Sequence, residues 1–390
     1  MLRFKLFALA AALPALSVSA LAADNLKIGM MTTLSGPGAS LGIDIRDGFA
    51  LAVKHLNQKI GDIPVEVLVA DDAQNPDTAK QIAERFVKKE KVDFATGVVF
   101  SNIVLAVGPT FFNSETFYIS ANAGPSQYAG AQCNPYFFNV AWQNDNLHEA
   151  MGKYMQDRGI KSAVLLAPNY PGGKDALSGV KAYYKGVIAD EIVTKLGQLD
   201  YAAEIAQIRA ANADALFIFL PGGMGVNFIK QYAQSGLMKK TPLYTQGFSG
   251  DEDVVRAVGP VMEGVYNTSQ WYREMDNPLN KRFVADFQKD YNRLPTLYAS
   301  QGYDAALLID AAVRQMQGKL DNKAALRKVL ETVKAPSVRG QYSFGPNHYP
   351  IQPYYLRRVE KNPDGTVDNK FVSKVADRLV DNYVAACKMP

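Results

Sequence analysis

The chain has 390 residues, a formal net charge of +4 and two cysteines, and 21% of its residues are charged. This length exceeds what a single hydrophobic core usually holds, so two domains are expected. The positive charges are spread along the chain without a basic block, and this distribution argues against nucleic acid as a partner.

The N-terminus has the pattern of a secretory signal peptide. Arg3 and Lys5 precede the apolar run 6–16, and Ala-Leu-Ala at 20–22 provides small residues for cleavage near Ala22 or Ala23. The run is too short to span a bilayer, and no later stretch is long and apolar enough to do so. We therefore predict that residues 1–23 are removed and that an exported, soluble chain results. Loss of the two basic residues lowers the formal charge from +4 to +2.

The first element of the mature chain is a strand, followed by a loop of small residues and an amphipathic helix. The strand is predicted at 26–31, and the loop contains Thr32, Thr33, Ser35, Gly36, Gly38 and Ser40. Apolar residues of the helix, from Ile45 to Leu56, recur on one face that must cover a sheet. Ligands of open α/β sheets bind beyond the carboxyl ends of the strands, so this loop is a candidate site.

The alternation of strands and helices continues to residue 120. Further strands are predicted at 65–70, 94–99 and 117–120, with helices at 76–89 and 102–112. This order predicts a parallel sheet with right-handed crossovers and helices on both faces. The pattern breaks in the aromatic and polar stretch 136–146.

A second set of alternating elements begins at residue 148. Helices are predicted at 148–158, 174–186, 201–210 and 224–235, and strands at 162–167, 187–193, 216–220 and 243–245. A strand-like segment near 265 is followed by helices at 278–291, 298–315 and 322–333 and by a hairpin of 349–359 and 371–375. We therefore predict two doubly wound α/β lobes, with the late helices completing the first and the hairpin completing the second.

Signals for catalysis are scarce. The three histidines are not at zinc-ligand spacing, and no Gly-x-Ser-x-Gly elbow occurs. Gly36, Gly38 and Gly42 follow a strand, but their spacing departs from that of a dinucleotide-binding turn, and Pro37 lies within it. We therefore predict no catalytic residue, no metal site and no cofactor, and we expect the loop to receive a small anion or polar ligand.

The two cysteines, Cys133 and Cys387, are far apart in the sequence. In an exported chain they are expected to form a disulfide that pins the C-terminal tail. The alternative is a pair of buried free thiols.

Two more strand-to-helix turns lie at the same predicted sheet edge as the glycine loop. Residues 100–102 follow the third strand, and residues 122–124 follow the fourth. Ser101 or Asn102 alone could equally cap a helix. The convergence of three turns favours a binding site.

Segments throughout the mature chain resemble the substrate-binding proteins of ABC importers of the branched-chain amino acid type. They read IGMMTTLSGPGASLG, ADDAQNPDTAKQIAERFV, VVFSN, ISANAGPS, YPGG and SQGYDAA. The resemblance implies the type I periplasmic binding fold, with two lobes joined by three crossovers, a ligand in the cleft and docking to membrane permease subunits. It implies a periplasmic protein, and we expect a monomer.

The resemblance also implies lobe boundaries and a closing motion. The first lobe is expected to comprise residues 24–141 plus 268–342, and the second residues 142–267 plus 343–390. Hinge strands are expected near 141–144, 266–268 and 342–344. Closure of the second lobe over a ligand would then stabilise the closed state.

Individual site residues carry over by their matching positions. Ser101 and the turn 122–124 match positions that hold a ligand carboxylate through hydroxyl and amide groups, and Tyr170 matches an aromatic residue that packs on the ligand. Amino-acid binders of the family have a glutamate for the ligand ammonium where this chain has Gly247. A buried ammonium without a carboxylate partner would cost several kcal/mol.

The predicted ligand is therefore an aromatic acid of the benzoate, hydroxybenzoate or cinnamate kind, with leucine-like amino acids or small amides as the alternative. An exported enzyme and a ligand-sensing ectodomain are the alternatives from other classes. The expected ligand-binding residues are Leu41, Phe100, Ser101, Asn102, Asn122, Ala123, Gly124, Trp142, Tyr170, Gly222, Gly247 and Phe248.

Overall fold

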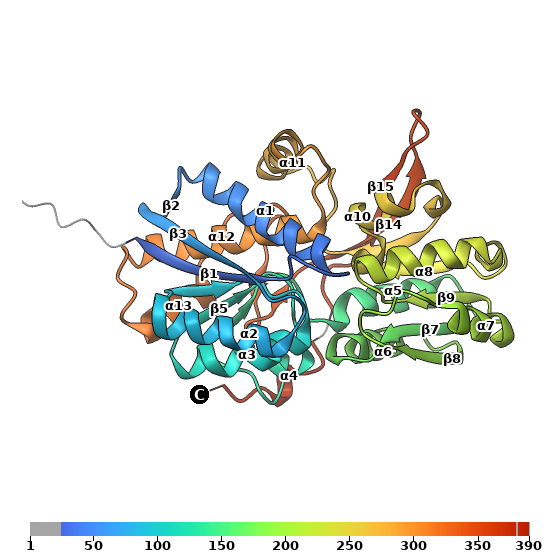
Figure 1. Ribbon diagram of the computed structural model, residues 1–390, viewed down its shortest axis with the longest axis horizontal. Helices are drawn as coiled ribbons and strands as arrows, with labels where there is room; N and C mark the ends of the chain where they lie inside the picture. Colours follow the sequence, from blue (N-terminus) through green and yellow to red (C-terminus); the bar gives the residue numbers. More distant parts are fainter. Residues whose placement is uncertain (1–24, 380, 390) are drawn as a thin grey trace, which may run out of the picture.

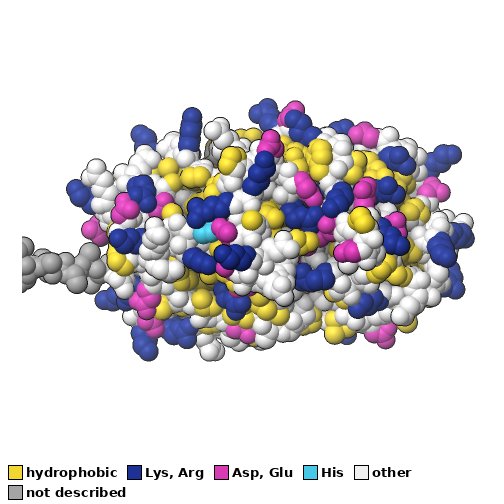
Figure 2. Space-filling model, turned by 90° about the horizontal axis from the view of Figure 1, so that it is seen from above, with side chains coloured by type: hydrophobic (Ala, Val, Ile, Leu, Met, Phe, Trp, Pro, Cys, Tyr) yellow, Lys and Arg dark blue, Asp and Glu magenta, His cyan; other side chains and the backbone are white. Residues whose placement is uncertain are grey.

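The computed structural model of the protein describes residues 25–379 and 381–389, and the predicted signal peptide lies outside them. Two lobes lie side by side along the long axis of the molecule, each with helices around its own sheet (Figure 1). None of the helices in the described part of the chain combines the length and apolar character that crossing a bilayer requires. Basic and acidic side chains are interspersed on the face shown in Figure 2.

The first sheet has six strands in the order β2-β3-β1-β4-β5-β6. The strands are β1 (Leu26–Thr32), β2 (Lys59–Ile60), β3 (Ile63–Asp71), β4 (Phe94–Thr96), β5 (Phe117–Ser120) and β6 (Phe137–Asn139). All neighbours pair in parallel except the short β2, so the predicted parallel sheet is confirmed. The sequence did not indicate β6, which has only three residues, but Asn139 Oδ1 accepts hydrogen bonds from the N–H groups of Ala141 and Trp142 and fixes the turn after it.

Helices from two distant parts of the chain cover this sheet. They are α1 (Ala39–His55), α2 (Pro76–Arg85), α3 (Ser101–Asn113), the short α4 (Ser126–Ala129), α11 (Pro278–Tyr291), α12 (Leu297–Gln315) and α13 (Lys323–Thr332). Helices α1 and α12 lie close together because Gly48 has no side chain; a Cβ there would lie 1.9 Å from the Ala299 carbonyl oxygen. The predicted return of the late helices to the first lobe is confirmed.

The second sheet has seven strands in the order β15-β14-β11-β10-β9-β7-β8. The strands are β7 (Ser162–Pro168), β8 (Val187–Thr194), β9 (Ala215–Ile218), β10 (Leu243–Gln246), β11 (Tyr266–Ser269), β14 (Tyr354–Lys361) and β15 (Val367–Ala376). Around them lie α5 (Asp145–Asp157), α6 (Pro171–Tyr183), α7 (Ala202–Ala211), α8 (Gly223–Gln234), α9 (Gly247–Gly250) and α10 (Glu252–Val258). The strands β7 to β11 pair in parallel, and the hairpin β14–β15 adds two antiparallel strands.

The hinge strand expected near 266–268 belongs to β11, which pairs with both β10 and β14 over these residues. The expected lobe boundaries remain a prediction. The hairpin begins at Tyr354 rather than 349, because residues 350–351 form β13 (Pro350–Ile351), which pairs with β12 (Ser343–Phe344) in a separate two-stranded sheet.

The C-terminal tail is bonded to both lobes. Cys133 and Cys387 form a disulfide with a Cα–Cα distance of 5.5 Å, which confirms the predicted bridge. The tail also contacts the second lobe. The Asn382 amide donates to Glu149 Oε1 at 2.9 Å, and the Tyr383 hydroxyl donates to Asp145 Oδ2 at 2.8 Å. Both acceptors lie on α5 of the second lobe, so the tail connects this helix to the first lobe.

The acidic groups of α5 should make the stability of the protein depend on pH. Burial raises the pKa of Asp145 to about 8, with the negative charges of Asp175 and Glu149 adding to the effect, and burial raises the pKa of Glu149 to about 7. An unfolded carboxyl titrates near pH 4, so between about pH 4 and pH 8 the folded state keeps protons that the unfolded state releases. The free energy of unfolding therefore falls as the pH rises through this window, by up to about 1.4 kcal/mol per pH unit for each carboxyl.

We expect Asp145→Asn to remove part of this slope. The variant should be more stable than the wild type at pH 8, and the difference should shrink as the pH approaches 5, when measured by urea unfolding at each pH. Asp157→Asn, at the exposed end of the same helix, is the matched control and should leave the slope unchanged. Parallel pH profiles for Asp145→Asn and the wild type would contradict this account.

Candidate functional site

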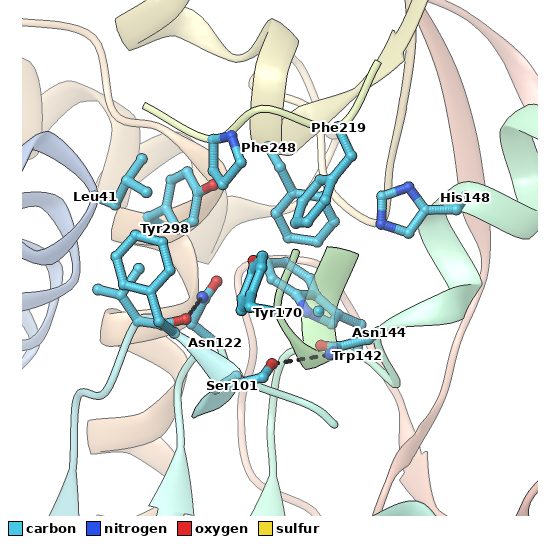
Figure 3. A pocket seen from close by; sticks show the side chains of 15 residues that line it. Leu41, Ser101, Asn122, Trp142, Asn144, His148, Tyr170, Phe219, Phe248 and Tyr298 are labelled. Atoms are coloured by element: carbon cyan, nitrogen blue, oxygen red, sulfur yellow. Dashed lines mark hydrogen bonds between the residues drawn. The ribbon is translucent and has the colours of Figure 1, made fainter. Parts of the chain in front are cut away.

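A pocket lies where strand-to-helix turns of the two lobes meet (Figure 3). The cavity volume is about 20 Å³, room for about one water molecule, so the walls must move apart before a ring-sized ligand can enter. The lining residues are Leu41, Val99, Phe100, Ser101, Asn122, Ala123, Trp142, Asn144, His148, Tyr170, Gly172, Phe219, Pro221, Phe248 and Tyr298.

The first lobe contributes hydrogen-bond donors at the start of α3. Phe100 is extended, and Ser101 begins the helix, so the first N–H groups of α3 have no partner within it. The Asn122 amide donates to the Val99 carbonyl oxygen at 2.6 Å and joins the turn after β5 to the turn after β4. Helix N-termini with free N–H groups favour anions, so this end of the pocket suits a carboxylate.

Asn144 organises the polar end of the pocket. Its Nδ2 donates to Ser101 Oγ at 3.0 Å and to Asp175 Oδ2 at 2.8 Å, while its Oδ1 accepts from the Gly124 N–H at 2.9 Å. Asn144 lies in the first segment that connects the lobes, and it holds Ser101 and the turn after β5 in fixed positions. Sequence reasoning did not select it, because a polar residue in an irregular connection carries no pattern.

The rest of the pocket is aromatic, with rings from both lobes. Trp142 and Phe248 pack edge to face with centroids 4.6 Å apart, and Phe219 lies 5.3 Å from Phe248. Tyr170 connects the two sides, with its ring 6.0 Å from Phe100 and 6.1 Å from Phe219. Flat rings favour offset or edge contacts of this kind, so these walls suit contact with another flat, apolar group.

The lining contains no lysine, arginine, aspartate or glutamate side chain. An anion in the pocket would therefore rely on N–H and hydroxyl donors, and a ligand ammonium would find no carboxylate on the walls. The Tyr298 hydroxyl is buried and has no hydrogen-bond partner among the described residues. Burial raises the pKa of Tyr298 well above its usual value, so this hydroxyl stays protonated and can donate.

Eight of the residues predicted from the sequence line the pocket: Leu41, Phe100, Ser101, Asn122, Ala123, Trp142, Tyr170 and Phe248. Asn102, Gly124, Gly222 and Gly247 do not. The N–H of Gly124 is already bonded to Asn144, so it is not a free donor for a ligand. Gly222 faces the opposite lobe, where a Cβ would lie 2.9 Å from the Pro37 carbonyl oxygen.

The backbone at Gly247 would direct a side chain away from the pocket. A Cβ at this position would lie 2.1 Å from Leu297 Cδ2 and 3.4 Å from Arg357 Nη2. A side chain at this position would therefore point toward Leu297 and not into the pocket. The lack of an ammonium partner follows instead from the absence of acidic side chains in the lining.

The lining residues that the sequence did not indicate are Val99, Asn144, His148, Gly172, Phe219, Pro221 and Tyr298. Phe219 and Pro221 follow β9, so the rule that placed the first-lobe turns at the sheet edge also applies to them. His148 and Tyr298 lie on α5 and α12, which enter the site from the connections between the lobes.

Direct hydrogen bonds join the lobes around the pocket. The Gly223 N–H donates to the Pro37 carbonyl oxygen at 2.9 Å, and Ser40 Oγ donates to Asp253 Oδ2 at 3.0 Å. On another side, Ser126 Oγ donates to Asp175 Oδ1 at 2.7 Å. The glycine-rich loop that opens the first lobe therefore contacts the second lobe directly.

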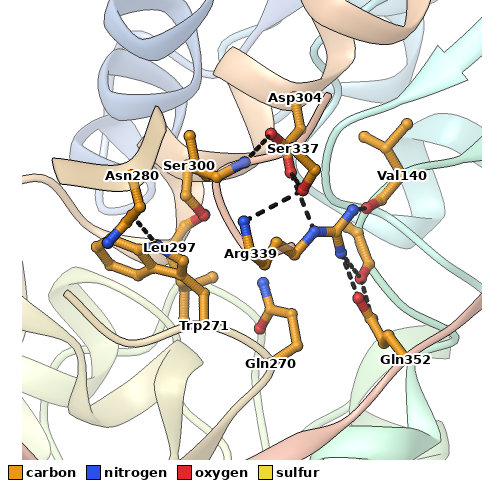
Figure 4. Close-up of polar contacts among 12 residues, drawn as sticks. Val140, Gln270, Trp271, Asn280, Leu297, Ser300, Asp304, Ser337, Arg339 and Gln352 are labelled. Atoms are coloured by element: carbon orange, nitrogen blue, oxygen red, sulfur yellow. Dashed lines mark hydrogen bonds and ion pairs between the residues drawn. The ribbon is translucent and has the colours of Figure 1, made fainter. Parts of the chain in front are cut away.

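Arg339 forms hydrogen bonds and an ion pair with the segments that connect the lobes (Figure 4). Its guanidinium pairs with Asp304 of α12 at 3.1 Å and donates to the carbonyl oxygens of Val140 and Ala141 in the first connection. It also donates to Gln352, whose own amide donates to the Ala141 carbonyl oxygen at 2.6 Å. These buried contacts fix the ends of two connections beside the first lobe.

The fold and the pocket define a class of two-lobed binding proteins that enclose a small molecule between parallel-sheet lobes. A family model described as periplasmic binding protein matches residues 25–365. This match spans far more than half of the chain, and the chain belongs to the family of periplasmic binding proteins.

Relatives within this family are solute-binding proteins of ABC transporters. A Leu/Ile/Val-binding protein homolog 6 from Brucella melitensis biotype 1 is 29% identical over 367 residues, which cover 91% of this chain and 93% of the relative. A solute-binding protein of an R. palustris ABC transporter, crystallised with benzoate, superimposes with a TM-score of 0.88 at 28% identity, over 93% of this chain and 99% of that one.

A second solved structure is the solute-binding protein of an ABC transporter from Rhodopseudomonas palustris BisB5 in complex with 3,4-dihydroxybenzoic acid. It has a TM-score of 0.86 and 29% identity, over 91% of this chain and 98% of that one. The type I periplasmic binding fold and the resemblance to ABC-transporter solute-binding proteins are thereby confirmed. The protein is a solute-binding protein of this transporter class.

Proposed function

We propose that the protein captures a small aromatic carboxylic acid, of the benzoate, hydroxybenzoate or cinnamate kind, in the pocket between its lobes. The observation that carries this proposal is the composition of the lining: aromatic rings from both lobes, donors at the start of α3 and no charged side chain. The carboxylate would accept hydrogen bonds from Ser101 and from the first N–H groups of α3, as anions do at helix N-termini. The ring would lie among Phe100, Tyr170 and Phe248.

The ligands of solved relatives support the same class. Structures at 28% and 29% identity hold benzoate and 3,4-dihydroxybenzoic acid. The second candidate is a branched-chain amino acid or a small amide, which the names of the sequence relatives favour. Against it stands the cost of burying an ammonium where no acidic side chain lines the pocket.

The mechanism that we propose is closure of the lobes around the acid. A monomer in the periplasm would bind the acid between open lobes, and closure would bring Tyr170 and Phe248 over the ring. A ligand shifts the equilibrium between open and closed lobes only by the difference in its affinity for the two states. Contacts from both lobes provide that difference. The closed form would then deliver the acid to the membrane permease subunits of the transporter.

A thermal-shift screen tests the ligand class. The mature protein is unfolded and refolded to remove any carried ligand and then mixed with benzoate, 3- and 4-hydroxybenzoate, cinnamate, phenylacetate, leucine, valine and short amides. A ligand at a hundredfold over its Kd should add about 2.7 kcal/mol to the free energy of unfolding. Shifts with one or more of the aromatic acids and none with leucine or valine are expected. A shift with leucine or valine alone would overturn the proposal in favour of the second candidate.

A further inference from the structure

His148 is a buried histidine without a hydrogen bond. Its side chain is 1% exposed and lines the pocket, and its buried Nδ1 has no hydrogen-bond partner among the described residues. The other two histidines differ: His55 contacts the Tyr303 hydroxyl and Asp286, and His348 contacts the Phe137 carbonyl oxygen and Glu331. Because buried polar groups are nearly always paired, the exception at His148 calls for a partner that the protein itself does not supply.

The surroundings of His148 are otherwise apolar. Its ring centroid lies 4.9 Å from that of Phe219, 5.4 Å from that of Phe248 and 5.8 Å from that of Phe217. Burial lowers the pKa of His148 to about 3, so the imidazole is neutral and offers one N–H donor and one lone pair. Another aromatic residue would pack here without the cost of unpaired nitrogens.

The imidazole faces the pocket from the second lobe, whereas the donors at the start of α3 belong to the first lobe. In Figure 3, His148 projects from α5 toward the rings of Phe219 and Phe248, while Ser101 lies on the first-lobe side near Asn144. A ligand whose carboxylate lies at Ser101 and whose ring lies among the aromatic side chains would therefore present another part of its ring to His148.

We propose that His148 recognises a hydroxyl group on the ring of the bound acid, so that the ligand is a hydroxylated aromatic acid rather than an unsubstituted one. This inference rests on the proposed function. A phenolic hydroxyl both donates and accepts, and it can therefore pair with whichever ring nitrogen of a neutral imidazole faces it. Sites built to hydrogen-bond a substrate hydroxyl discriminate strongly against the analogue that lacks it, because the polar group of the site is then left unpaired.

The test compares matched ligands on matched proteins by isothermal titration calorimetry. The ligands are benzoate, 3-hydroxybenzoate, 4-hydroxybenzoate, 3,4-dihydroxybenzoate and 4-methylbenzoate, and the proteins are the refolded wild type, His148→Phe and His148→Leu. For the wild type, we expect the best hydroxylated acid to bind at least about tenfold more tightly than benzoate and 4-methylbenzoate. In His148→Phe this preference should fall to within about threefold, because only the hydroxylated acids lose a hydrogen-bond partner.

Two outcomes overturn the inference while the proposed function stands: the wild type binds benzoate as tightly as every hydroxylated acid, or His148→Phe keeps the preference of the wild type. If none of the acids binds the wild type, the inference and the proposed function fall together. His148→Leu and the side-chain ¹⁵N chemical shifts of His148 in the wild type provide independent readouts should His148→Phe fail to fold. A hydroxylated acid should shift these resonances toward the values of a hydrogen-bonded imidazole, and benzoate should not; equal shifts with both ligands would contradict the inference.

Discussion

Replacing Ser101 with aspartate is expected to weaken the binding of an aromatic acid by at least about a thousandfold. Like charges brought together in a buried site cost several kcal/mol, and each 1.4 kcal/mol is a factor of ten in Kd. An acidic side chain in the first turn of a helix is favourable, but the Asn144 amide that donates to Ser101 Oγ also donates to Asp175, so some loss of stability is expected as well. The measurement is the Kd by calorimetry, with the thermal midpoint of the unliganded protein as the test of folding.

Ser101→Asn is the matched control for size. Asparagine has nearly the shape of aspartate without its charge, so its loss of affinity should be much smaller, about that of one hydrogen bond to a charged group, or roughly tenfold to a hundredfold. If aspartate and asparagine weaken binding equally, the effect is steric, and the carboxylate of the ligand does not lie at the start of α3.

Removing the disulfide is expected to produce the largest loss of stability. The bridge joins positions 254 residues apart, and closing so long a loop restricts the unfolded chain strongly. Chain-entropy estimates for a loop of this size reach about 5 kcal/mol, and measured losses for native disulfides are typically about 2–5 kcal/mol. We expect Cys133→Ala with Cys387→Ala to lower the free energy of unfolding by this amount and to release the contacts of Tyr383 with α5.

The readout is urea unfolding of the wild type and the double variant, each with and without dithiothreitol. The reductant should destabilise the wild type to the level of the variant and leave the variant unchanged. An oxidised wild type that titrates two free thiols, or one whose midpoint the reductant does not move, would contradict the prediction.

The sequence predicts the lobes well because their elements follow strong periodic patterns. Most strands of the two sheets and the helix at 278–291 follow from apolar runs and helical stripes, and the return of the late helices to the first lobe follows from the lack of strands between them. The errors lie where tertiary contacts decide. Three residues form β6 only because β5 lies beside them, and residues 350–351 leave the expected hairpin because they pair with β12.

The residues of the candidate site also divide into those that the sequence predicts and those that depend on tertiary contacts. The rule that ligands lie beyond the carboxyl ends of parallel strands predicts Ser101 and Asn122, since position after a strand is readable from the sequence, whereas Tyr170 follows from the resemblance to the family. It could not show that Gly247 faces Leu297, because the direction of a side chain in a one-turn helix depends on the angle at which the turn leaves the strand. His148 was set aside as one of three isolated histidines, and only its missing hydrogen bonds distinguish it.

The close packing of α1 against α12 has a consequence for how the chain is made. All six strands of the first sheet precede residue 140, yet α12 begins at Leu297, and the bonding partner of Cys133 is Cys387. Strands β7 to β11 are contiguous in sequence and can pair before α12 is in place, while the face of α1 that contains Gly48 still has no helix to cover it. The lobe whose strands come first in the sequence is therefore the last to be completed.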